Sequence, residues 1–281
     1  MTTINRYPDM KPHLGRLTKV QNIAPEIKLL EVELLDESGL DPLHFQPGQF
    51  AFISAFGVGE APFGISSLPK TSGMLEFAVQ RLGSVTTELH ELAVDDIIGI
   101  RGPLGNHFPM EEFEGQHILV IGGGIGGAPL RPVIEYILQN REKFGDLTIL
   151  WAARSPDLLL FKEDYELWRQ APNTKLFLTV DQGDDEWDGE VGLITDLLEK
   201  ISPSANNTTA ITCGPPVMIY YADKVLDKLG FQPDRRYVTL EARMHCGIGK
   251  CGRCNLGQKL VCVDGPVFSM KEASQLLEPF L

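Results

Sequence analysis

The segment HILVIGGGIGGAPLRP, residues 117–132, decides how this chain folds. Its first five residues form an apolar run that predicts a buried strand, and the glycines after it lead into an amphipathic helix. Gly122, Gly124 and Gly127 match the pattern G-x-G-x-x-G, a turn that lets a dinucleotide pyrophosphate approach a helix N-terminus. A glycine turn needed only for packing between helix and strand is the alternative for this motif alone.

The alternation of apolar strands with amphipathic helices continues downstream of the glycine turn. Strands are expected at residues 147–154, 175–181 and 207–215, and helices at 130–145, 157–171, 191–201 and 217–230. Strands that alternate with helices of about 10–15 residues indicate a parallel sheet covered on both faces. The fold class expected for this part is therefore α/β.

Upstream, residues 11–110 have the pattern of β-structure. Short apolar runs such as IKLLEVELL and QFAFISAF are separated by Gly, Pro and Asp, as an antiparallel barrel or sandwich requires. The helix expected in this part is VTTELHEL at 85–92, and the acidic loop EEFEG at 111–115 follows. We expect a β-barrel at 10–113, an α/β domain at 114–238 and a glycine- and cysteine-rich loop segment at 239–281.

Four of the five cysteines lie in one stretch, HCGIGKCGRCNLGQKLVC at 245–262. Its spacing, C-x4-C-x2-C-x7-C, begins like the plant-type motif for a [2Fe-2S] cluster, in which thiolates hold two irons. Glycines between them let the backbone turn tightly and aim N–H groups at sulfur. The count also allows a structural zinc site, although zinc sites more often pair two C-x2-C knuckles. The expected metal ligands are Cys246, Cys251, Cys254 and Cys262.

The end of the second α/β strand bears on cofactor choice. A dinucleotide site usually has an acid there for the ribose hydroxyls, but this chain has Arg154 and Ser155. Without an acid at this position, the site has room for the 2′-phosphate of a nicotinamide dinucleotide phosphate. Exposure of Arg154 to solvent, or pairing with Asp157 or Asp164, is the alternative.

Three further turns suit cofactor contacts. Cys213, Gly214 and Pro215 end a strand, where Cys213 either touches a nicotinamide ring or is an ordinary buried thiol. In APFGISSLP, at 61–69, the aromatic face of Phe63 and the polar groups of Ser66 suit a planar ring. In GSVTTEL, at 83–89, the start of the expected helix suits an anion. Ordinary turn and cap chemistry is the alternative for these turns.

Composition limits the classes of protein. Among 281 residues, 25 Lys and Arg face 38 Asp and Glu, which gives a formal net charge of −13. This acidity argues against nucleic acid as a partner, because binding a duplex requires a cationic face. The sequence shows no apolar run of the roughly 18 residues that a membrane span needs and no basic-then-apolar leader. We therefore expect a soluble, cytoplasmic protein.

Taken together, these motifs resemble the ferredoxin–NADP reductase superfamily, and within it the iron–sulfur subfamily of dihydroorotate dehydrogenase electron-transfer subunits and soluble hydrogenase (sulfhydrogenase) gamma subunits. The segments that carry the resemblance are PGQF, GSVTTELHEL, IRGPLGN, GGGIGGAPLR, TCGPP, LEARMHCGIGKCGRCNLG and DGPVFS. The superfamily motif R-x-Y-[ST] is replaced here, with Ala61, Phe63 and Gly64 at its three defined positions. The resemblance implies an FAD-binding β-barrel, a nicotinamide-binding α/β domain and a [2Fe-2S] segment.

The resemblance also assigns residues. The flavin ring would be lined by Phe63, Gly64, Ile65, Ser66 and Ser67, and the FAD pyrophosphate held by Gly83, Ser84, Val85 and Thr86. On the nicotinamide side the resemblance assigns Gly124, Gly126, Pro129, Cys213, Gly214 and Pro215. The expected set also includes Ile125, which lies within the same glycine turn, and Arg154, which follows from its place after the second strand. Pro129 also suits the first turn of its helix on its own account, because its missing N–H costs little there.

The implied activity is electron transfer. A nicotinamide exchanges electrons as hydride and an iron–sulfur cluster exchanges them singly, and a flavin between them does both. No catalytic acid, base or nucleophile is expected. The implied partner is the catalytic part of a multi-subunit complex, a [NiFe] hydrogenase first, with an anaerobic sulfite reductase or a dihydroorotate dehydrogenase as alternatives. A zinc-stapled, non-catalytic nucleotide-binding module is the alternative of another class.

Overall fold

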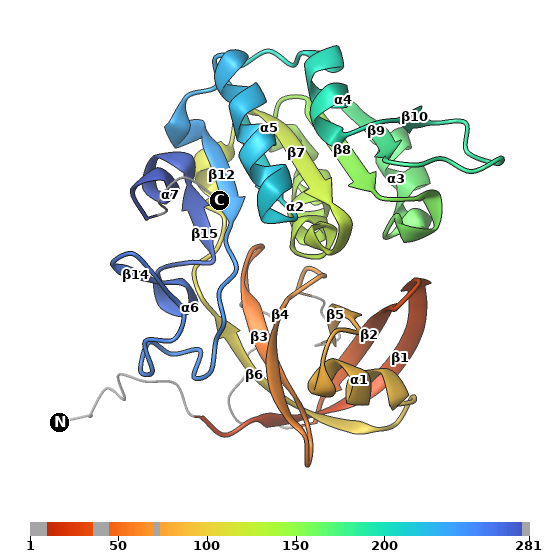
Figure 1. Ribbon diagram of the computed structural model, residues 1–281, viewed down its shortest axis with the longest axis vertical. Helices are drawn as coiled ribbons and strands as arrows, with labels where there is room; N and C mark the ends of the chain where they lie inside the picture. The colour runs from red at the N-terminus through yellow and green to blue at the C-terminus, as the bar shows by residue number, and fades with distance from the viewer. Residues whose placement is uncertain (1–9, 36–44, 70–73, 277–281) are drawn as a thin grey trace.

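The computed structural model describes residues 10–35, 45–69 and 74–276, which form a β-domain and an α/β domain (Figure 1). The β-domain is a curled six-stranded sheet with the strand order β4-β3-β6-β1-β2-β5, and its paired strands are antiparallel. The strands are β1 (His13–Ala24), β2 (Ile27–Leu34), β3 (Phe50–Ala55), β4 (Gly59–Gly64), β5 (Met74–Gln80) and β6 (Ile97–Leu104).

The chain after β4 ties the two edges of this sheet together. Ser66 N donates to Glu76 O of β5 over 2.8 Å. Glu76 N donates to Ser67 Oγ and Ala78 N to Ser66 Oγ. These hydrogen bonds join the chain after β4 to β5 and give the sheet a barrel-like shape, although β4 and β5 remain the two edge strands of the sheet. Apolar side chains that alternate along the strands fill the interior, and the helix α1 (Ser84–Glu91) closes one side with the fully buried Leu89. The expected antiparallel, barrel-like β-domain and its helix are confirmed.

The α/β domain is a seven-stranded sheet in the order β10-β9-β8-β7-β11-β12-β15, parallel except for β15. The strands are β7 (His117–Gly123), β8 (Leu147–Ala153), β9 (Thr174–Val180), β10 (Glu190–Val191), β11 (Thr208–Cys213), β12 (Arg236–Thr239) and β15 (Val267–Ser269). The helices are α2 (Gly127–Gln139), α3 (Tyr165–Gln170), α4 (Ile194–Ile201) and α5 (Pro216–Lys228).

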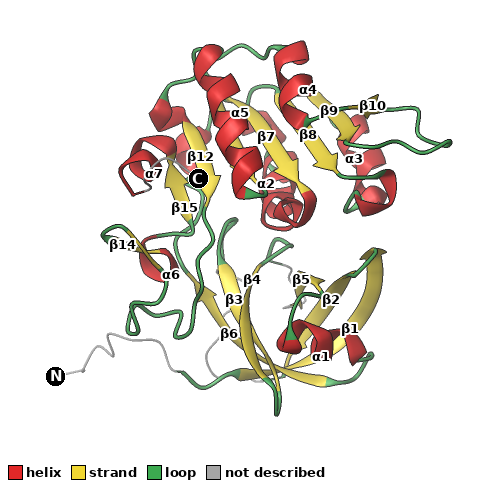
Figure 2. Cartoon of the chain, in the orientation of Figure 1, coloured by secondary structure: helices red, strands yellow, loops and turns green. Residues whose placement is uncertain are grey.

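Helices cover both faces of this sheet, as predicted (Figure 2). Helices α2 and α3 bury their apolar sides in one cluster with strands β7 and β8, and α4 and α5 form a second cluster on the other face. Short 3₁₀ turns join the elements, at η1 (Met110–Phe113), η2 (Gly124–Gly126), η3 (Arg141–Lys143), η4 (Pro156–Leu158), η5 (Lys162–Asp164) and η6 (Pro233–Arg235).

Three helices are shorter than the sequence pattern predicts. The helix expected at 191–201 begins only at Ile194, because Val191 lies in β10. The helix expected at 130–145 ends at Gln139, and η3 follows it. The helix expected at 157–171 reduces to α3, because Phe161 has a left-handed φ of 58° that interrupts helical geometry. The carbonyl of Leu160 instead accepts hydrogen bonds from the Trp151 indole and the Tyr165 hydroxyl. The helix prediction for residues 157–161 is wrong because the apolar segment at Leu160 and Phe161 is buried without forming an α-helix.

The C-terminal part returns to the α/β sheet after forming the cysteine loop. It contains β13 (Asn255–Leu256), β14 (Lys259–Leu260), α6 (Val261–Asp264) and α7 (Met270–Leu276), in addition to β15. Strand β15 pairs antiparallel with β12, so the loop is anchored in the sheet on both sides. The last residues of the expected segment 239–281 lie outside the described residues. Within the described part of the chain, no helix combines the length and the apolar character needed to cross a bilayer.

Candidate functional site

The glycine turn and the Cys213 turn meet at the middle of the parallel sheet. Strands β7 and β11 are neighbours, yet the chain continues from β7 to β8 on one side and from β11 to β12 on the other. Such a switch point is where open α/β sheets bind ligands. A Cβ added to Gly126 would lie 2.5 Å from Gly214 N and 2.6 Å from Cys213 O. The structure therefore brings these two predicted motifs into backbone contact.

The glycines of the motif have different tasks. Gly122 and Gly127 pack on the indole of Trp151, where an added Cβ would lie 2.7 and 2.4 Å from ring atoms. These two serve packing between helix and sheet. Gly124 has a left-handed φ of 56° and open space around its Cβ position, so the chain turns there beside an unfilled region.

Cys213 is a buried thiol at the end of β11. Its side chain is 4% exposed, and its sulfur accepts a hydrogen bond from Thr239 Oγ1 over 2.7 Å. Burial raises the pKa of Cys213 to about 12, and the bond from Thr239 offsets only part of that rise. At neutral pH the thiol is therefore protonated and does not act as a nucleophile.

Arg154 follows β8 at the same edge of the sheet and is exposed. Gln182 N donates to its carbonyl over 2.9 Å, which fixes the backbone there. The carboxylate of Asp164 binds Arg131, and that of Asp157 accepts a hydrogen bond from Ser155. Within residues 10–35, 45–69 and 74–276, no ion pair holds the Arg154 guanidinium.

The predicted flavin segment lies where the two domains meet. A Cβ added to Gly64, the last residue of β4, would lie 3.2 Å from Pro129 Cβ of α2. Phe63 is half-buried one position earlier. The structure thus places the expected flavin-ring segment directly beside the expected nicotinamide segment.

Three residues of that flavin segment have structural tasks. Ile65 is 3% exposed, and its N–H donates to Gln49 O over 3.1 Å. Ser66 and Ser67 are fully buried, and their hydroxyls accept the hydrogen bonds from β5 described above. Side-chain contact with a flavin from this segment would therefore come from Phe63, with backbone groups supplying the remainder.

An ion cluster beside this junction was missed by sequence reasoning. Arg131 of α2 donates to Asp164 over 2.6 Å and to Ser66 O over 3.1 Å, and it pairs with Glu76 of β5 and Glu135 of α2. The cluster thereby joins the α/β domain to the barrel. Burial raises the pKa of Glu135, and the charge of Arg131 opposes that rise. The i,i+4 spacing of Arg131 and Glu135 is the one local signal in the sequence.

The start of α1 offers an anion site on the barrel. Gly83 and Ser84 are exposed, and Val85 and Thr86 are half-buried. Thr86 Oγ1 accepts hydrogen bonds from Leu82 N over 2.8 Å and Gly83 N over 2.9 Å, which fixes the turn before the helix. The first-turn N–H groups of a helix have no partner within the helix, and they favour a bound phosphate.

The cysteine loop packs on the outer face of the barrel. Cys246, Cys254 and Cys262 are buried in an apolar cluster with Phe50 and Phe52 of β3, and Cys251 is exposed. Backbone amides point at sulfur: Gly249 N lies 3.2 Å from Cys262 Sγ, Lys250 N 3.3 Å from Cys246 Sγ, and Arg253 N 3.5 Å from Cys251 Sγ. Amide donors aimed at sulfur fit thiolates that hold an iron–sulfur cluster.

The thiols in this loop influence one another: Cys251 acts on Cys246, and both Cys254 and Cys246 act on Cys262. Burial raises the pKa of Cys246, but amides of the loop and the Cys251 thiol outweigh it and bring the pKa to about 7. Burial and the neighbouring Cys254 thiol raise the pKa of Cys262 to about 12. Among the described residues, no three His, Cys, Asp or Glu side chains are grouped to hold one metal ion.

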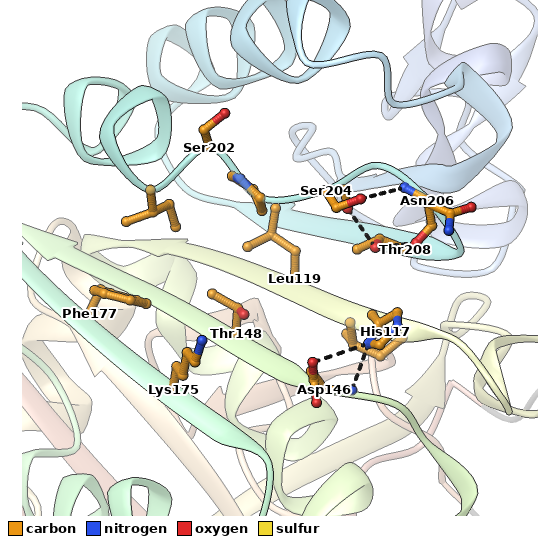
Figure 3. Close-up of a pocket in the computed structure, with 13 residues that line it drawn as sticks. His117, Leu119, Asp146, Thr148, Lys175, Phe177, Ser202, Ser204, Asn206 and Thr208 are labelled. Atoms are coloured by element: carbon orange, nitrogen blue, oxygen red, sulfur yellow. Dashed lines mark hydrogen bonds and ion pairs between the residues drawn. The ribbon is translucent and has the colours of Figure 1, made fainter.

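A surface hollow of about 420 Å³ lies at the opposite, amino-terminal edge of the parallel sheet (Figure 3). His117, Asp146, Lys175 and Ser204 are among the residues that line it. His117 Nδ1 accepts a hydrogen bond from Asp146 N over 2.9 Å. Because open parallel sheets bind ligands at their carboxyl edge, we assign no cofactor to this hollow.

Three segments of the chain match known protein families. Residues 14–108 match the oxidoreductase FAD-binding domain, and residues 120–224 match the oxidoreductase NAD-binding domain. Residues 241–274 match the iron–sulfur cluster binding domain of dihydroorotate dehydrogenase B. FAD-binding, NAD-binding and iron–sulfur cluster-binding domains are therefore present in this order, as predicted.

A solved structure described as an NADH-dependent reduced ferredoxin–NADP oxidoreductase, studied for flavin-based electron bifurcation, has the same fold. Its TM-score is 0.76 at 25% identity, with 95% of this chain and 92% of that chain covered. The FAD/NAD-binding domain of a nitric oxide dioxygenase from Vibrio cholerae is also similar in fold, with a TM-score of 0.72 at 19% identity over 81% of this chain and 98% of that chain.

Two curated relatives cover nearly the whole chain. The sulfhydrogenase 1 gamma subunit of Pyrococcus furiosus is 38% identical, over 92% of this chain and 90% of the relative. A probable dihydroorotate dehydrogenase B electron transfer subunit of Methanocaldococcus jannaschii is 33% identical, with the same coverage of 92% and 90%. The chain therefore belongs to the family of flavin- and nicotinamide-binding oxidoreductase subunits with a C-terminal iron–sulfur domain, which includes sulfhydrogenase gamma subunits and dihydroorotate dehydrogenase B electron transfer subunits.

Proposed function

We propose that this protein is an NAD(P)H-dependent electron-transfer subunit that passes electrons between NAD(P)H, FAD and a [2Fe-2S] cluster, and to or from a catalytic partner. One observation carries the proposal. The cysteine loop packs on barrel strands β3 and β6, and the same barrel touches the nicotinamide motif through Gly64 and Pro129. The three cofactor segments thus adjoin in one molecule, as a relay requires.

In this proposal the residues of the chain bind and position the cofactors. First-turn N–H groups of α1 would bind the FAD pyrophosphate, beside the exposed residues Gly83 and Ser84. The backbone at Gly124–Gly126 and Cys213–Pro215 would bind the nicotinamide nucleotide at the switch point. Bound flavin supplies the exchange between hydride and single electrons. No side chain is needed as a catalytic acid or base.

The four cysteines would hold the cluster in pairs. Cys246 with Cys251 would bind one iron, and Cys254 with Cys262 the other, because the thiol of Cys251 interacts with Cys246 and the thiol of Cys254 interacts with Cys262. We propose functional units at 10–113, 114–238 and 239–281. The third unit would carry the cluster and face the partner, since Cys251 is its exposed thiol.

The proposed partner is a hydrogenase-type catalytic subunit, because the relative that is 38% identical is a sulfhydrogenase gamma subunit. A dihydroorotate dehydrogenase is the second candidate, supported by relatives at 33% identity. Purification of the native complex and identification of its subunits separates them. Recovery of a nickel-containing subunit supports the first, and recovery of a dihydroorotate dehydrogenase supports the second.

The visible spectrum and metal content of the pure protein test the proposal itself. We expect flavin bands superposed on broad iron–sulfur absorption, with FAD and iron released on denaturation. A colourless protein that contains zinc in place of iron would contradict the proposal and favour a zinc-stapled nucleotide-binding module.

A first prediction concerns the FAD phosphates. In Thr86→Asp the carboxylate can keep the hydrogen bonds from Leu82 N and Gly83 N, but its charge opposes the phosphates. Repulsion of about 1–4 kcal/mol corresponds to roughly fivefold to nearly a thousandfold weaker FAD binding. FAD occupancy after gel filtration measures this. Thr86→Asn, which keeps the size without the charge, should retain FAD. Equal occupancy in both variants would contradict the assignment.

A second prediction concerns the choice of nicotinamide. If Arg154 contacts the 2′-phosphate of NADPH, the contact is worth about 1.5–3 kcal/mol. Arg154→Ala should then weaken NADPH binding roughly tenfold to over a hundredfold and leave NADH binding unchanged. The rate of flavin reduction against the concentration of each nucleotide measures this.

The control is Arg169→Ala, which removes another exposed cation of the same domain. It should affect neither nucleotide. Equal effects of Arg154→Ala on NADH and NADPH would remove Arg154 from the site.

A further inference from the structure

Arg101 of β6 joins the barrel to the cysteine loop. Its side chain is 2% exposed, and its Nη1 donates a hydrogen bond to the carbonyl of Cys246 over 2.8 Å. Its Nη2 donates to Glu60 Oε1 of β4 over 2.7 Å. The guanidinium carbon lies 4.5 Å from the ring centre of Phe52, on the strand between β4 and β6. Three strands of the barrel therefore hold this cation against the first expected cluster ligand.

The loop meets the barrel closely at the same point. Gly247 has a left-handed φ of 71°, and a Cβ there would lie 2.6 Å from Phe52 Cε2. At the other end of the loop, Asn106 Nδ2 donates to Asp264 O over 2.9 Å and to Val267 O over 2.7 Å. Val267 N donates back to Asn106 Oδ1 over 2.9 Å. The segment IRGPLGN thus fixes both ends of the cysteine loop, with Arg101 at the end that begins with Cys246.

We propose that Arg101 is a positioning residue for the iron–sulfur cluster, which fixes the Cys246 backbone on the barrel and raises the reduction potential of the cluster with its buried positive charge. The inference rests on the proposed function, because it requires a cluster held by Cys246. Arginine is charged at every physiological pH, and burial strengthens its field. A cluster becomes more negative on reduction, so a cation beside a ligand stabilises the reduced form.

The carboxylate of Glu60 allows a second, independent test of the proposal. Its side chain is 29% exposed, so it offsets the charge of Arg101 while remaining in contact with water. Removal of the cation and removal of the carboxylate should therefore move the potential in opposite directions. A role of Arg101 in holding the loop alone predicts no such opposition.

The experiment is an EPR-monitored redox titration of the purified holoprotein, with iron and FAD content measured for each variant. Arg101→Gln should lower the reduction potential of the cluster by about 59 mV. For a one-electron couple this corresponds to an about tenfold lower ratio of reduced to oxidised cluster at the same applied potential. Glu60→Gln should raise the reduction potential. Arg101→Lys keeps the charge and should stay close to wild type. Arg16→Gln is the matched control, since Arg16 forms an exposed pair with Glu33 elsewhere on the same sheet.

Each outcome decides the matter. Opposite shifts in Arg101→Gln and Glu60→Gln support the proposal, and a potential in Arg101→Gln equal to that in Arg16→Gln overturns it. Equal shifts in Arg101→Gln and Arg101→Lys also overturn it, because the charge would then have no effect. If Arg101→Gln loses its iron, the reduction potential of the cluster in Glu60→Gln becomes the test. An unchanged or lower potential in Glu60→Gln overturns the proposal. A wild-type protein without a cluster signal would instead contradict the proposed function.

Discussion

Cys254→Ala is expected to lose most of its cluster iron while it keeps bound FAD. A [2Fe-2S] cluster needs four protein ligands, and Cys254 is a buried thiol paired with Cys262. The expected FAD residues lie on β4, on the chain that follows it and at the start of α1, so loss of the cluster leaves them in place. Iron and FAD per protein, together with the EPR signal of the reduced protein, measure both effects.

The matched control for this variant is Cys213→Ala. It removes another buried thiol, but one that lies at the end of β11 and is bonded to Thr239. This variant should keep its full iron content. Retention of iron and of the EPR signal in Cys254→Ala or Cys246→Ala would show that the ligand set is wrong.

Gly126→Ala is expected to weaken NADH binding strongly. The new methyl group would collide with the backbone of Cys213 and Gly214, at distances of 2.5–2.6 Å that real Cβ atoms do not show. Relief requires the two strand ends at the switch point to separate. Overpacking of this kind costs about 1–3 kcal/mol, or roughly fivefold to over a hundredfold in affinity if it falls on the binding site.

Flavin reduction at increasing NADH concentration, with thermal unfolding measured alongside, tests this prediction. Gly145→Ala is the control, because its Cβ would crowd His117 Nδ1 at 2.8 Å, at the opposite edge of the sheet. That variant should lose stability but bind NADH normally. Normal NADH saturation in Gly126→Ala would place the nicotinamide away from this turn.

The sequence predicts the parts of the fold that depend on local pattern. Alternation of strands and helices around Gly122–Gly127 predicts the covered parallel sheet, and the spacing of the cysteines predicts the iron–sulfur segment. The pattern fails at Leu160 and Phe161, because a buried extended segment and a helix turn have similar apolar composition. Local periodicity does not separate the two.

Contacts between distant residues could not be predicted in this way. Arg101 and Cys246 are 145 positions apart, and Arg131 and Glu76 are 55 apart. No periodic signal links such positions, and each Arg lies in an ordinary strand or helix pattern. The packing of two domains decides these partners. For the same reason the sequence assigns the polar groups of Ser66 to a planar ring, whereas the structure bonds the Ser66 hydroxyl to Ala78 N of β5.

Anaerobic addition of NADH or NADPH to the purified protein, followed by optical and EPR spectroscopy, tests the electron relay most directly. The account predicts that at least one nucleotide bleaches the flavin bands and that the EPR signal of a reduced [2Fe-2S] cluster appears in the same sample. A flavin that is reduced while the cluster stays oxidised, with a chemical reductant still able to reduce that cluster, would contradict the proposed path from NAD(P)H through FAD to the iron–sulfur centre.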